Sequence, residues 1–147
     1  MRIAVGADHA GFALKEHVRA TLEHAGHDVL DVGTTSAEPV DYPAFAAQAA
    51  RLVAAGDAEL GVLACGSGVG VAIVANKIPG VRAVDAHDPD EAELSRRHND
   101  ANVVTLSGAR LAPEQADAIV ARFLETAFEG GRHARRVAQI TDLEARG

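Results

Sequence analysis

The sequence predicts an α/β domain, and three features of the chain support this prediction. Short apolar segments typical of strands alternate with amphipathic segments typical of helices along the whole chain. The expected strands lack polar alternation, as in parallel strands that helices cover on both faces. Loops are short, and no linker or repeat interrupts the 147 residues. We therefore expect one domain, residues 1–147, with a three-layer α/β/α Rossmann-like fold, a five-stranded parallel sheet and an extra C-terminal helix.

The expected elements follow one another in β-α order. Strands are expected at residues 2–6, 28–32, 60–64, 81–85 and 102–106. Helices are expected at residues 11–25, 43–55, 69–77, 89–98, 113–128 and 132–145. The first helix has one apolar face, which carries Phe12, Leu14, Val18 and Leu22.

Residues that favour helix ends mark several of these boundaries. Gly26 and Gly56 follow the first two helices, where a C-terminal glycine is common. Pro43 suits the first turn of the second helix. Asp88, with Glu91 three residues later, predicts an N-cap and a capping box for the fourth helix.

Composition excludes several classes of partner. The net charge is −7 and aromatic residues make up 3% of the chain, so we expect no nucleic-acid binding, which needs a basic face and stacking platforms. The sequence shows no signal-peptide pattern and no apolar span of about 18 residues, so we expect no membrane partner and a cytoplasmic location. A single cysteine excludes an intrachain disulfide and a cysteine-rich zinc site.

The most informative stretch is residues 61–71, GVLACGSGVGV. It reads as a buried strand that ends at Cys65, a glycine-rich turn and the start of a helix. Ligands bind at the carboxyl ends of parallel strands, and such a turn offers backbone N–H groups to an anion. A thiol placed there has a lowered pKa and acts as a base or nucleophile. The alternative is that Cys65 is a small buried apolar residue, the commonest fate of a free cysteine.

A second candidate, Asp8 and His9, follows the first strand. Gly6 and Gly11 flank this pair, but their spacing differs from the dinucleotide-binding pattern G-x-G-x-x-G. The polar pair would face a ligand at the end of the strand. The alternative for Asp8 is that it only caps the first helix.

A third candidate is basic. Arg132 and Arg136 lie one helical turn apart in the first turns of the last helix, where they repel each other and oppose the helix dipole. A bound phosphate would reverse both effects, and Gly130 and Gly131 would allow the backbone to approach it closely. The alternative is a solvated basic stretch. We favour a site for a small anion.

Right-handed crossovers place the carboxyl ends of all five strands at one edge of the sheet. We expect this edge to gather the polar residues Asp8, His9, Cys65, Asp85, His87, His98, Asn99, Ser107 and Arg110. His98 suits acid–base chemistry at neutral pH, although a histidine at a helix C-terminus also favours the dipole. We read His17, His24 and His27 as surface residues without metal-ligand spacing, and we expect no metal site.

Taken together, several segments resemble the type B ribose-5-phosphate isomerases, within a wider family that includes allose- and galactose-6-phosphate isomerases. These segments are residues 4–12 (AVGADHAGF), 41–43 (DYP), 65–70 (CGSGVG), 75–77 (ANK), 82–83 (RA), 95–102 (SRRHNDAN) and 129–133 (EGGRH). The resemblance runs from Arg2 to about Glu144, and its motifs are specific in combination. It implies an aldose–ketose isomerase of the pentose phosphate pathway that interconverts D-ribose 5-phosphate and D-ribulose 5-phosphate through an enediolate, without metal or other cofactor.

The resemblance also implies roles for individual residues. Cys65 would be the base that moves the proton between C1 and C2, and His98 would open the furanose ring. The enediolate oxygen would be stabilised by Ser67 and by the backbone N–H groups of Gly66, Gly68, Val69 and Gly70. The sugar and its phosphate would be lined by Asp8, His9, Tyr42 and Asn99. The phosphate would be held by Arg110, Arg132 and Arg136, with His9. Members of this family are homodimers or tetramers with sites at the subunit interface.

Two alternatives remain beside ribose 5-phosphate. Some relatives carry threonine at the position of Ser67, and others replace the cysteine by a glutamate in a longer loop. The shorter cysteine loop of this chain leaves room for a six-carbon sugar, so allose 6-phosphate and galactose 6-phosphate are alternative substrates. A tetrose phosphate is a further alternative. A nucleotide-binding module without catalysis is the second alternative, and it predicts indifference to the loss of Cys65.

Overall fold

The computed structural model describes residues 1–146 and confirms the predicted α/β class. The strands are β1 (Arg2–Ala7), β2 (Asp28–Asp31), β3 (Leu60–Cys65), β4 (Ala83–Asp85) and β5 (Val103–Ser107). The helices are α1 (Phe12–His24), α2 (Tyr42–Ala54), α3 (Val69–Ala75), α4 (Pro89–Asn99), α5 (Pro113–Glu125) and α6 (Arg132–Arg146). The strands form one parallel sheet in the order β2-β1-β3-β5-β4, so β3 lies at its centre.

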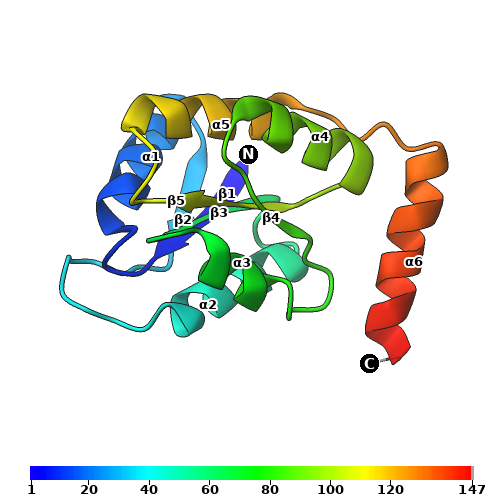
Figure 1. Ribbon diagram of the computed structural model, residues 1–147, viewed down its shortest axis with the longest axis horizontal. Helices are drawn as coiled ribbons and strands as arrows, with labels where there is room; N and C mark the ends of the chain where they lie inside the picture. The colour runs from blue at the N-terminus through cyan, green and yellow to red at the C-terminus, as the bar shows by residue number, and fades with distance from the viewer. Residues whose placement is uncertain (147) are drawn as a thin grey trace.

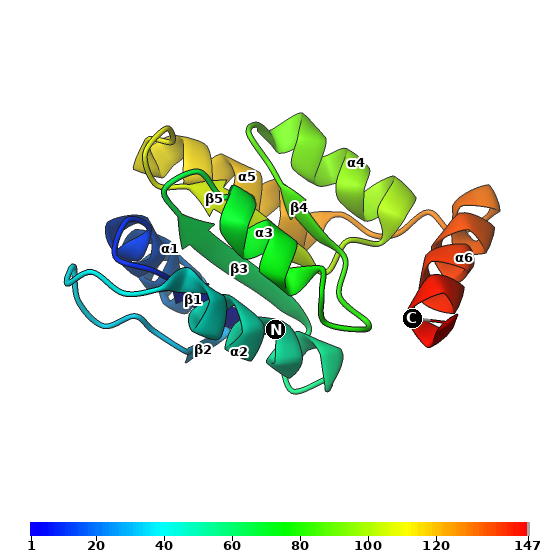
Figure 2. The same cartoon turned by 60° about the horizontal axis from the view of Figure 1, so that its bottom comes forward.

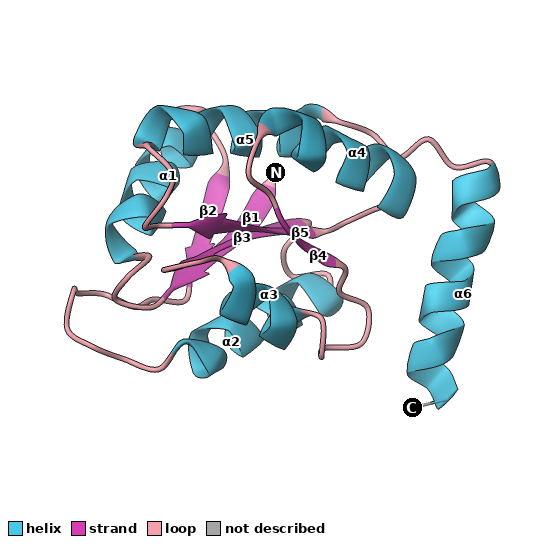
Figure 3. Ribbon diagram, viewed as in Figure 1, coloured by secondary structure: helices cyan, strands magenta, loops and turns pink. Residues whose placement is uncertain are grey.

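The helices form a layer on each face of the sheet (Figure 1). Helices α1, α4 and α5 cover one face, and α2 and α3 cover the other, as the secondary-structure colouring makes clear (Figure 3). Helix α6 stands apart from both layers, beside the C-terminal end of α4. The predicted three-layer domain with an extra C-terminal helix is confirmed.

Two apolar clusters, one on each face, hold the layers together. Ile3 and Val5 of β1 point into the first cluster, with Phe123 of α5, and all three are buried. Ala4 points to the other side and joins the second cluster, which also contains Cys65. Because successive residues of a strand face opposite sides, apolar strands bury both of their faces.

Most helix ends lie within a few residues of their predicted positions. Gly26 and Gly56 have positive φ angles of 92° and 82°, as expected of a glycine after a helix. Asp88 accepts a hydrogen bond from the backbone N–H of Glu91 over 2.8 Å, which confirms the N-cap. The Glu91 carboxylate accepts from the N–H of His87 rather than from that of Asp88, so the capping box is only half formed.

Several elements are shorter than predicted, and two of them, α5 and β4, have an identifiable reason. Helix α5 ends at Glu125 instead of residue 128, because Thr126 is extended and its hydroxyl donates to the carbonyl of Arg122 over 2.6 Å. Strand β4 lacks residues 81 and 82, since the backbone N–H of Arg82 donates to the side chain of Asn102 over 2.8 Å. Within residues 1–146, none of the helices has the length and apolar character needed to span a membrane.

Candidate active site

Cys65 is the last residue of the central strand β3, and only 4% of its surface is exposed. The chain then turns through residues 66–68, and α3 begins at Val69. The backbone N–H of Gly68 donates to Sγ of Cys65 over 3.2 Å. A donor at this distance stabilises a thiolate more than a thiol. The predicted position of Cys65, at a strand end beneath a glycine-rich turn, is confirmed.

Close packing explains Gly68 of the turn and Gly70 in the first turn of α3. Gly68 has a φ of 79°, and a Cβ there would also overlap the carboxylate of Asp85. A Cβ on Gly70 would come within 2.9 Å of the hydroxyl of Tyr42. The Tyr42 ring, at the start of α2, therefore lies directly against the first turn of α3. The family resemblance predicted that Tyr42 contacts the sugar.

Hydroxyl groups of β5 anchor the turn from the neighbouring strand. Thr105 donates to the carbonyl of Gly68 and Ser107 donates to the carbonyl of Gly66, both over 2.7 Å. The backbone N–H of Val69 donates to the exposed Ser67 Oγ over 3.1 Å. Thr105 belongs to none of the motifs that the sequence offers. The signal that could have revealed it is a polar residue inside an otherwise apolar strand.

Three other predicted residues lie at the same edge. Asp8 is buried after β1, and its Oδ1 accepts a hydrogen bond from the N–H of Gly11 over 3.0 Å. This bond closes the turn that precedes α1, whose N-cap is Gly11, so Asp8 does not cap the helix, and the bond occupies one of its two carboxylate oxygens. His9 is exposed, and its Nδ1 accepts from the N–H of Val40 over 3.2 Å, which ties it to the loop before α2. Arg110 is exposed just after β5.

The remaining predicted residues lie at the other end of the molecule. Helix α4 runs back antiparallel to the strands, so His98 and Asn99 lie where the strands begin, and their expected place at the carboxyl edge is wrong. A hydrogen bond supports this placement of Asn99 at the start of the strands. The Nε of Arg82, just before β4, donates to the carbonyl of Asn99 over 3.1 Å. Helix α6, with Arg132 and Arg136 exposed on it, stands beside this end. Figures 1 and 2 both place α6 far from the turn between β3 and α3.

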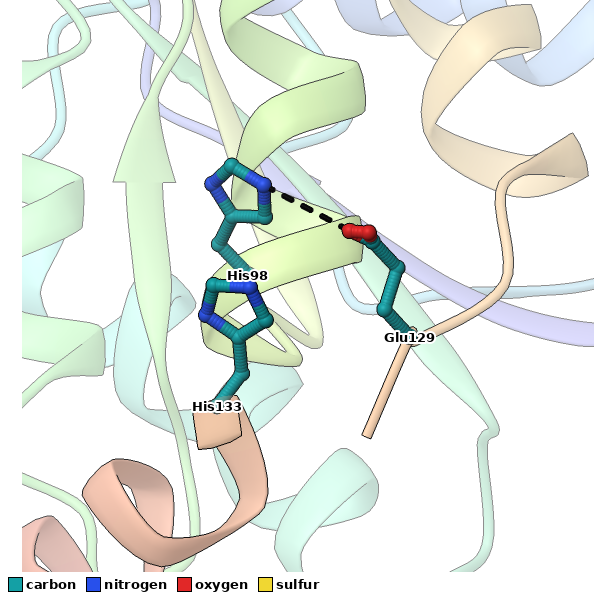
Figure 4. Close-up of side chains that lie close together, drawn as sticks. All are labelled: His98, Glu129 and His133. Atoms are coloured by element: carbon teal, nitrogen blue, oxygen red, sulfur yellow. Dashed lines mark ion pairs between the residues drawn. The ribbon is translucent and has the colours of Figure 1, made fainter. Parts of the chain in front are cut away.

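His98 belongs to a small polar cluster that the sequence analysis did not assemble (Figure 4). Its ring stacks on the ring of His133, with centroids 4.3 Å apart and an interplanar angle of 11°. Its Nε2 lies 3.6 Å from a carboxylate oxygen of Glu129. Burial lowers the pKa of His133. The nearby His98, Arg132 and Arg136 lower it further, whereas Glu129 raises it. The lowered pKa favours the neutral form of His133, so its ring can stack on that of His98 without adding a positive charge there.

The three side chains of this cluster each offer a donor atom, and these atoms lie within 4.8 Å of one another. Stacked imidazole rings direct their nitrogen lone pairs along parallel planes, whereas a tetrahedral metal site needs lone pairs that converge. The cluster therefore suits polar contacts to a ligand better than it suits metal coordination.

Comparison with known proteins agrees with this geometry. The family described as Ribose/Galactose Isomerase matches residues 3–140. Ribose-5-phosphate isomerase B of Escherichia coli strain K12 is 47% identical over 145 residues, which cover 99% of this chain and 97% of that protein. This chain belongs to the ribose/galactose isomerase family.

Solved structures of family members have the same fold. Ribose-5-phosphate isomerase B of Clostridium thermocellum is 40% identical, with a TM-score of 0.98 and 99% of each chain covered. The enzyme of Mycoplasma genitalium, solved with bound ribulose 5-phosphate, is 38% identical, with a TM-score of 0.95 over 99% of this chain and 97% of that one. The family resemblance inferred from the sequence motifs is confirmed.

Proposed function

We propose that this protein interconverts D-ribose 5-phosphate and D-ribulose 5-phosphate. The observation that carries the proposal is the only cysteine of the chain, buried at the end of the central strand with the Gly68 N–H donating to its sulfur. The relative from Escherichia coli is named for this activity, and that from Mycoplasma genitalium binds ribulose 5-phosphate. Both relatives extend over nearly the whole chain.

The proposed chemistry moves one proton between neighbouring carbons. The Cys65 thiolate removes the proton from C2 of the open-chain aldose, and the electron pair moves onto the C1 oxygen to give the enediolate. The hydroxyl proton at C2 passes to the oxygen at C1, the Cys65 thiol returns its proton to C1, and the C2 oxygen becomes the ketone. The carbon skeleton and its oxidation level as a whole are unchanged, so the reaction requires no external oxidant or reductant.

The turn after Cys65 is proposed to stabilise the enediolate. Negative charge develops on the sugar oxygens as the proton leaves, and preorganised donors lower the energy of that state. Ser67 is exposed, and its Oγ already accepts the N–H of Val69, which leaves its hydroxyl proton free for a substrate oxygen. The backbone N–H groups of Gly66 and Gly70 are the other proposed donors.

The phosphate grip and the ring-opening group are proposed to come from a second copy of the chain. His98, Arg132 and Arg136 cannot serve the Cys65 of their own chain, because they lie at the opposite end of the sheet. Helix α6 projects from the body and exposes Ile140 and Leu143, which are 40% and 65% exposed. In a two-fold dimer, both ends would meet and form two equivalent composite sites.

Within such a site, His98 would move the protons that open the furanose ring. Its contact with Glu129 orients the imidazole, and the stacked His133 holds the ring in place. Arg110 of the Cys65 chain would meet Arg132 and Arg136 of the second copy around the phosphate. Asp8, His9, Tyr42 and Asn99 are proposed to contact the sugar.

A steady-state assay on a panel of phosphosugars tests the substrate. We expect the highest kcat/KM for ribose 5-phosphate, with lower values for allose 6-phosphate, galactose 6-phosphate and a tetrose phosphate. Treatment with a chelator should leave the rate unchanged, since no proposed step uses a metal. A preference for a six-carbon sugar would keep the reaction class and replace the substrate. No turnover of any sugar, together with nucleotide binding, would reject the proposal.

A further inference from the structure

Asp85 lies beside the active-site turn, yet none of the steps proposed above uses it. It ends β4, and its side chain is only 16% exposed. Its Oδ1 lies against Gly68, where a Cβ would overlap it, and 3.2 Å from Oγ1 of Thr105. Oγ1 of Thr105 also lies 2.7 Å from the carbonyl oxygen of Gly68. A partly buried carboxyl group thus touches the turn that follows Cys65, directly and through a hydroxyl.

A count of protons assigns a direction to these contacts. The Thr105 hydroxyl carries one proton, and a carbonyl oxygen can only accept. The shorter contact, to Gly68, takes that proton. An ionised Asp85 carboxylate, 3.2 Å from Oγ1, competes for that proton, whereas a protonated Asp85 carboxyl donates to Oγ1 and leaves the Thr105 proton to the Gly68 carbonyl.

The chain of hydrogen bonds continues beyond Gly68 to the active-site hydroxyl. The Gly68 carbonyl and the Val69 N–H belong to the same peptide group, and this N–H donates to Ser67 Oγ over 3.1 Å. All donors then point in one direction, from Asp85 through Thr105 and the peptide to Ser67. Hydrogen bonds in such a series polarise and strengthen one another.

We propose that Asp85 is a positioning residue that acts through Thr105 and the Gly68–Val69 peptide to strengthen Ser67 as a hydrogen-bond donor to the enediolate. The inference rests on the proposed function for its effect on rate, but the relay itself is a property of the folded chain. Ionised Asp85 would compete for the proton of Thr105, so the bond to Gly68 would weaken and the series would be interrupted.

The surroundings of Asp85 bear on its ionisation. Burial raises the pKa of its carboxyl, and the carboxylate of Glu91 on α4 acts in the same direction. Three other groups lower this pKa. They are His87, whose Nε2 lies 3.5 Å from Oδ2 of Asp85, the hydroxyl of Thr105 on β5, and Arg110 just after β5. Helix α3, which packs on the other side of the turn, has no titratable side chain.

The first test compares Asp85→Asn with the unchanged protein from about pH 5 to about pH 9, a range that includes a raised carboxyl pKa. An asparagine amide donates to Thr105 at every pH. The ratio of the two kcat values should be close to one at low pH and rise to about fivefold once Asp85 ionises, the size of one neutral hydrogen bond. KM should change little, because the relay acts on charge that develops during the reaction.

Removing the hydroxyl separates the relay from the simple loss of a charge. In a Thr105→Val background, Asp85→Asn should lose its pH-dependent advantage, whereas Thr105→Ser should retain it. Thr105→Ala removes the same hydroxyl with less bulk, should valine disturb folding. An equal advantage with and without the hydroxyl would overturn the relay in favour of a direct effect of charge. A ratio independent of pH would overturn it as well.

A second readout does not depend on turnover. The amide proton resonance of Val69, followed by NMR, should move as Asp85 ionises, and this movement should vanish in Asp85→Asn and in Thr105→Val. An unchanged movement in Thr105→Val would reject the relay. A protein that shows the movement but does not isomerise ribose 5-phosphate would reject the proposed function and retain the relay.

Discussion

At the scale of single residues, the thiol of Cys65 is both buried and hydrogen-bonded. A cysteine that only fills space needs no donor, whereas here the Gly68 N–H points at the sulfur over 3.2 Å. The second apolar cluster surrounds the same side chain. Cys65 therefore contributes both to the apolar packing and to the proposed chemistry. A substitution that tests its chemistry must leave the packing intact.

Replacing Cys65 by alanine should reduce kcat by at least about 10² to 10⁴-fold, the usual contribution of a general base. Binding of ribose 5-phosphate, measured by calorimetry, should stay within about threefold, because the proposed phosphate contacts remain. The melting temperature serves as the control for folding. Activity within about threefold of the unchanged protein would remove Cys65 from the role of base.

The two exposed arginines of α6 provide a second test at this scale. Arg132→Ala and Arg136→Ala should each raise KM by about 10 to 150-fold, because a hydrogen bond to a charged group contributes roughly 1.5–3 kcal/mol. Arg135→Ala, which removes an equally exposed arginine from the same helix, is the matched control and should change KM by less than about twofold. Equal effects at all three positions would indicate general attraction of the substrate instead of a specific grip.

At the scale of elements, a buried lysine links α1 to β2. Lys15 is only 3% exposed, although a lysine on an amphipathic helix is usually solvated. Its Nζ donates to both carboxylate oxygens of Asp31 over 2.9 Å and to the carbonyl of Thr34 over 2.8 Å. These bonds fix the segment that follows β2 at the edge of the sheet where the site lies.

Lys15→Met should destabilise the protein, because the Thr34 carbonyl loses its lysine donor and Asp31 keeps only the N–H of Gly33 and the more distant Arg19. We expect a loss of about 2 kcal/mol in the free energy of unfolding. Breaking an exposed ion pair costs roughly 0–1 kcal/mol and breaking a buried one roughly 3–5 kcal/mol, and this pair lies between them because Asp31 is partly exposed. Urea unfolding measures this loss. Lys77→Met, at the exposed second lysine of the chain, is the control and should change stability by less than about 0.5 kcal/mol. Equal stabilities of the two variants would contradict the structural role of Lys15.

At the scale of the whole molecule, the proposed site residues divide into two groups at opposite ends of the sheet. One group surrounds the turn after Cys65, and the other lies at the end of α4 and on α6 (Figure 2). The composite site proposed above, formed by two copies, would bring the groups together.

Mixing two inactive variants tests this arrangement. Cys65→Ala and His98→Asn chains, unfolded and refolded together, should pair at random, so that about half of the dimers are mixed. In a mixed dimer one site carries both changes and the other carries none, so activity should return to about a quarter of that of the unchanged protein. Mass spectrometry checks that the chains have exchanged. Recovery near zero would refute the composite site without touching the isomerase assignment.

The sequence by itself determined the layers of the fold and the place of Cys65. Apolar strands, helix-ending glycines and the turn at residues 66–68 are local patterns, and local backbone chemistry decides them. The motifs also identified the family, since they extend along nearly the whole chain. The place of His98 also follows from the order of the elements, because a helix between two parallel strands runs antiparallel to them and ends where they begin, so its expected position at the carboxyl edge misread that order. Only the tertiary structure decided which distant groups come into contact, such as the ring of His98 with that of His133. The contact of Asp85 with Thr105 likewise depends on the pairing of β4 with β5, and the burial of Lys15 depends on how α1 packs beside β2. These contacts join residues distant in sequence, and a local pattern carries no information about which distant groups will meet.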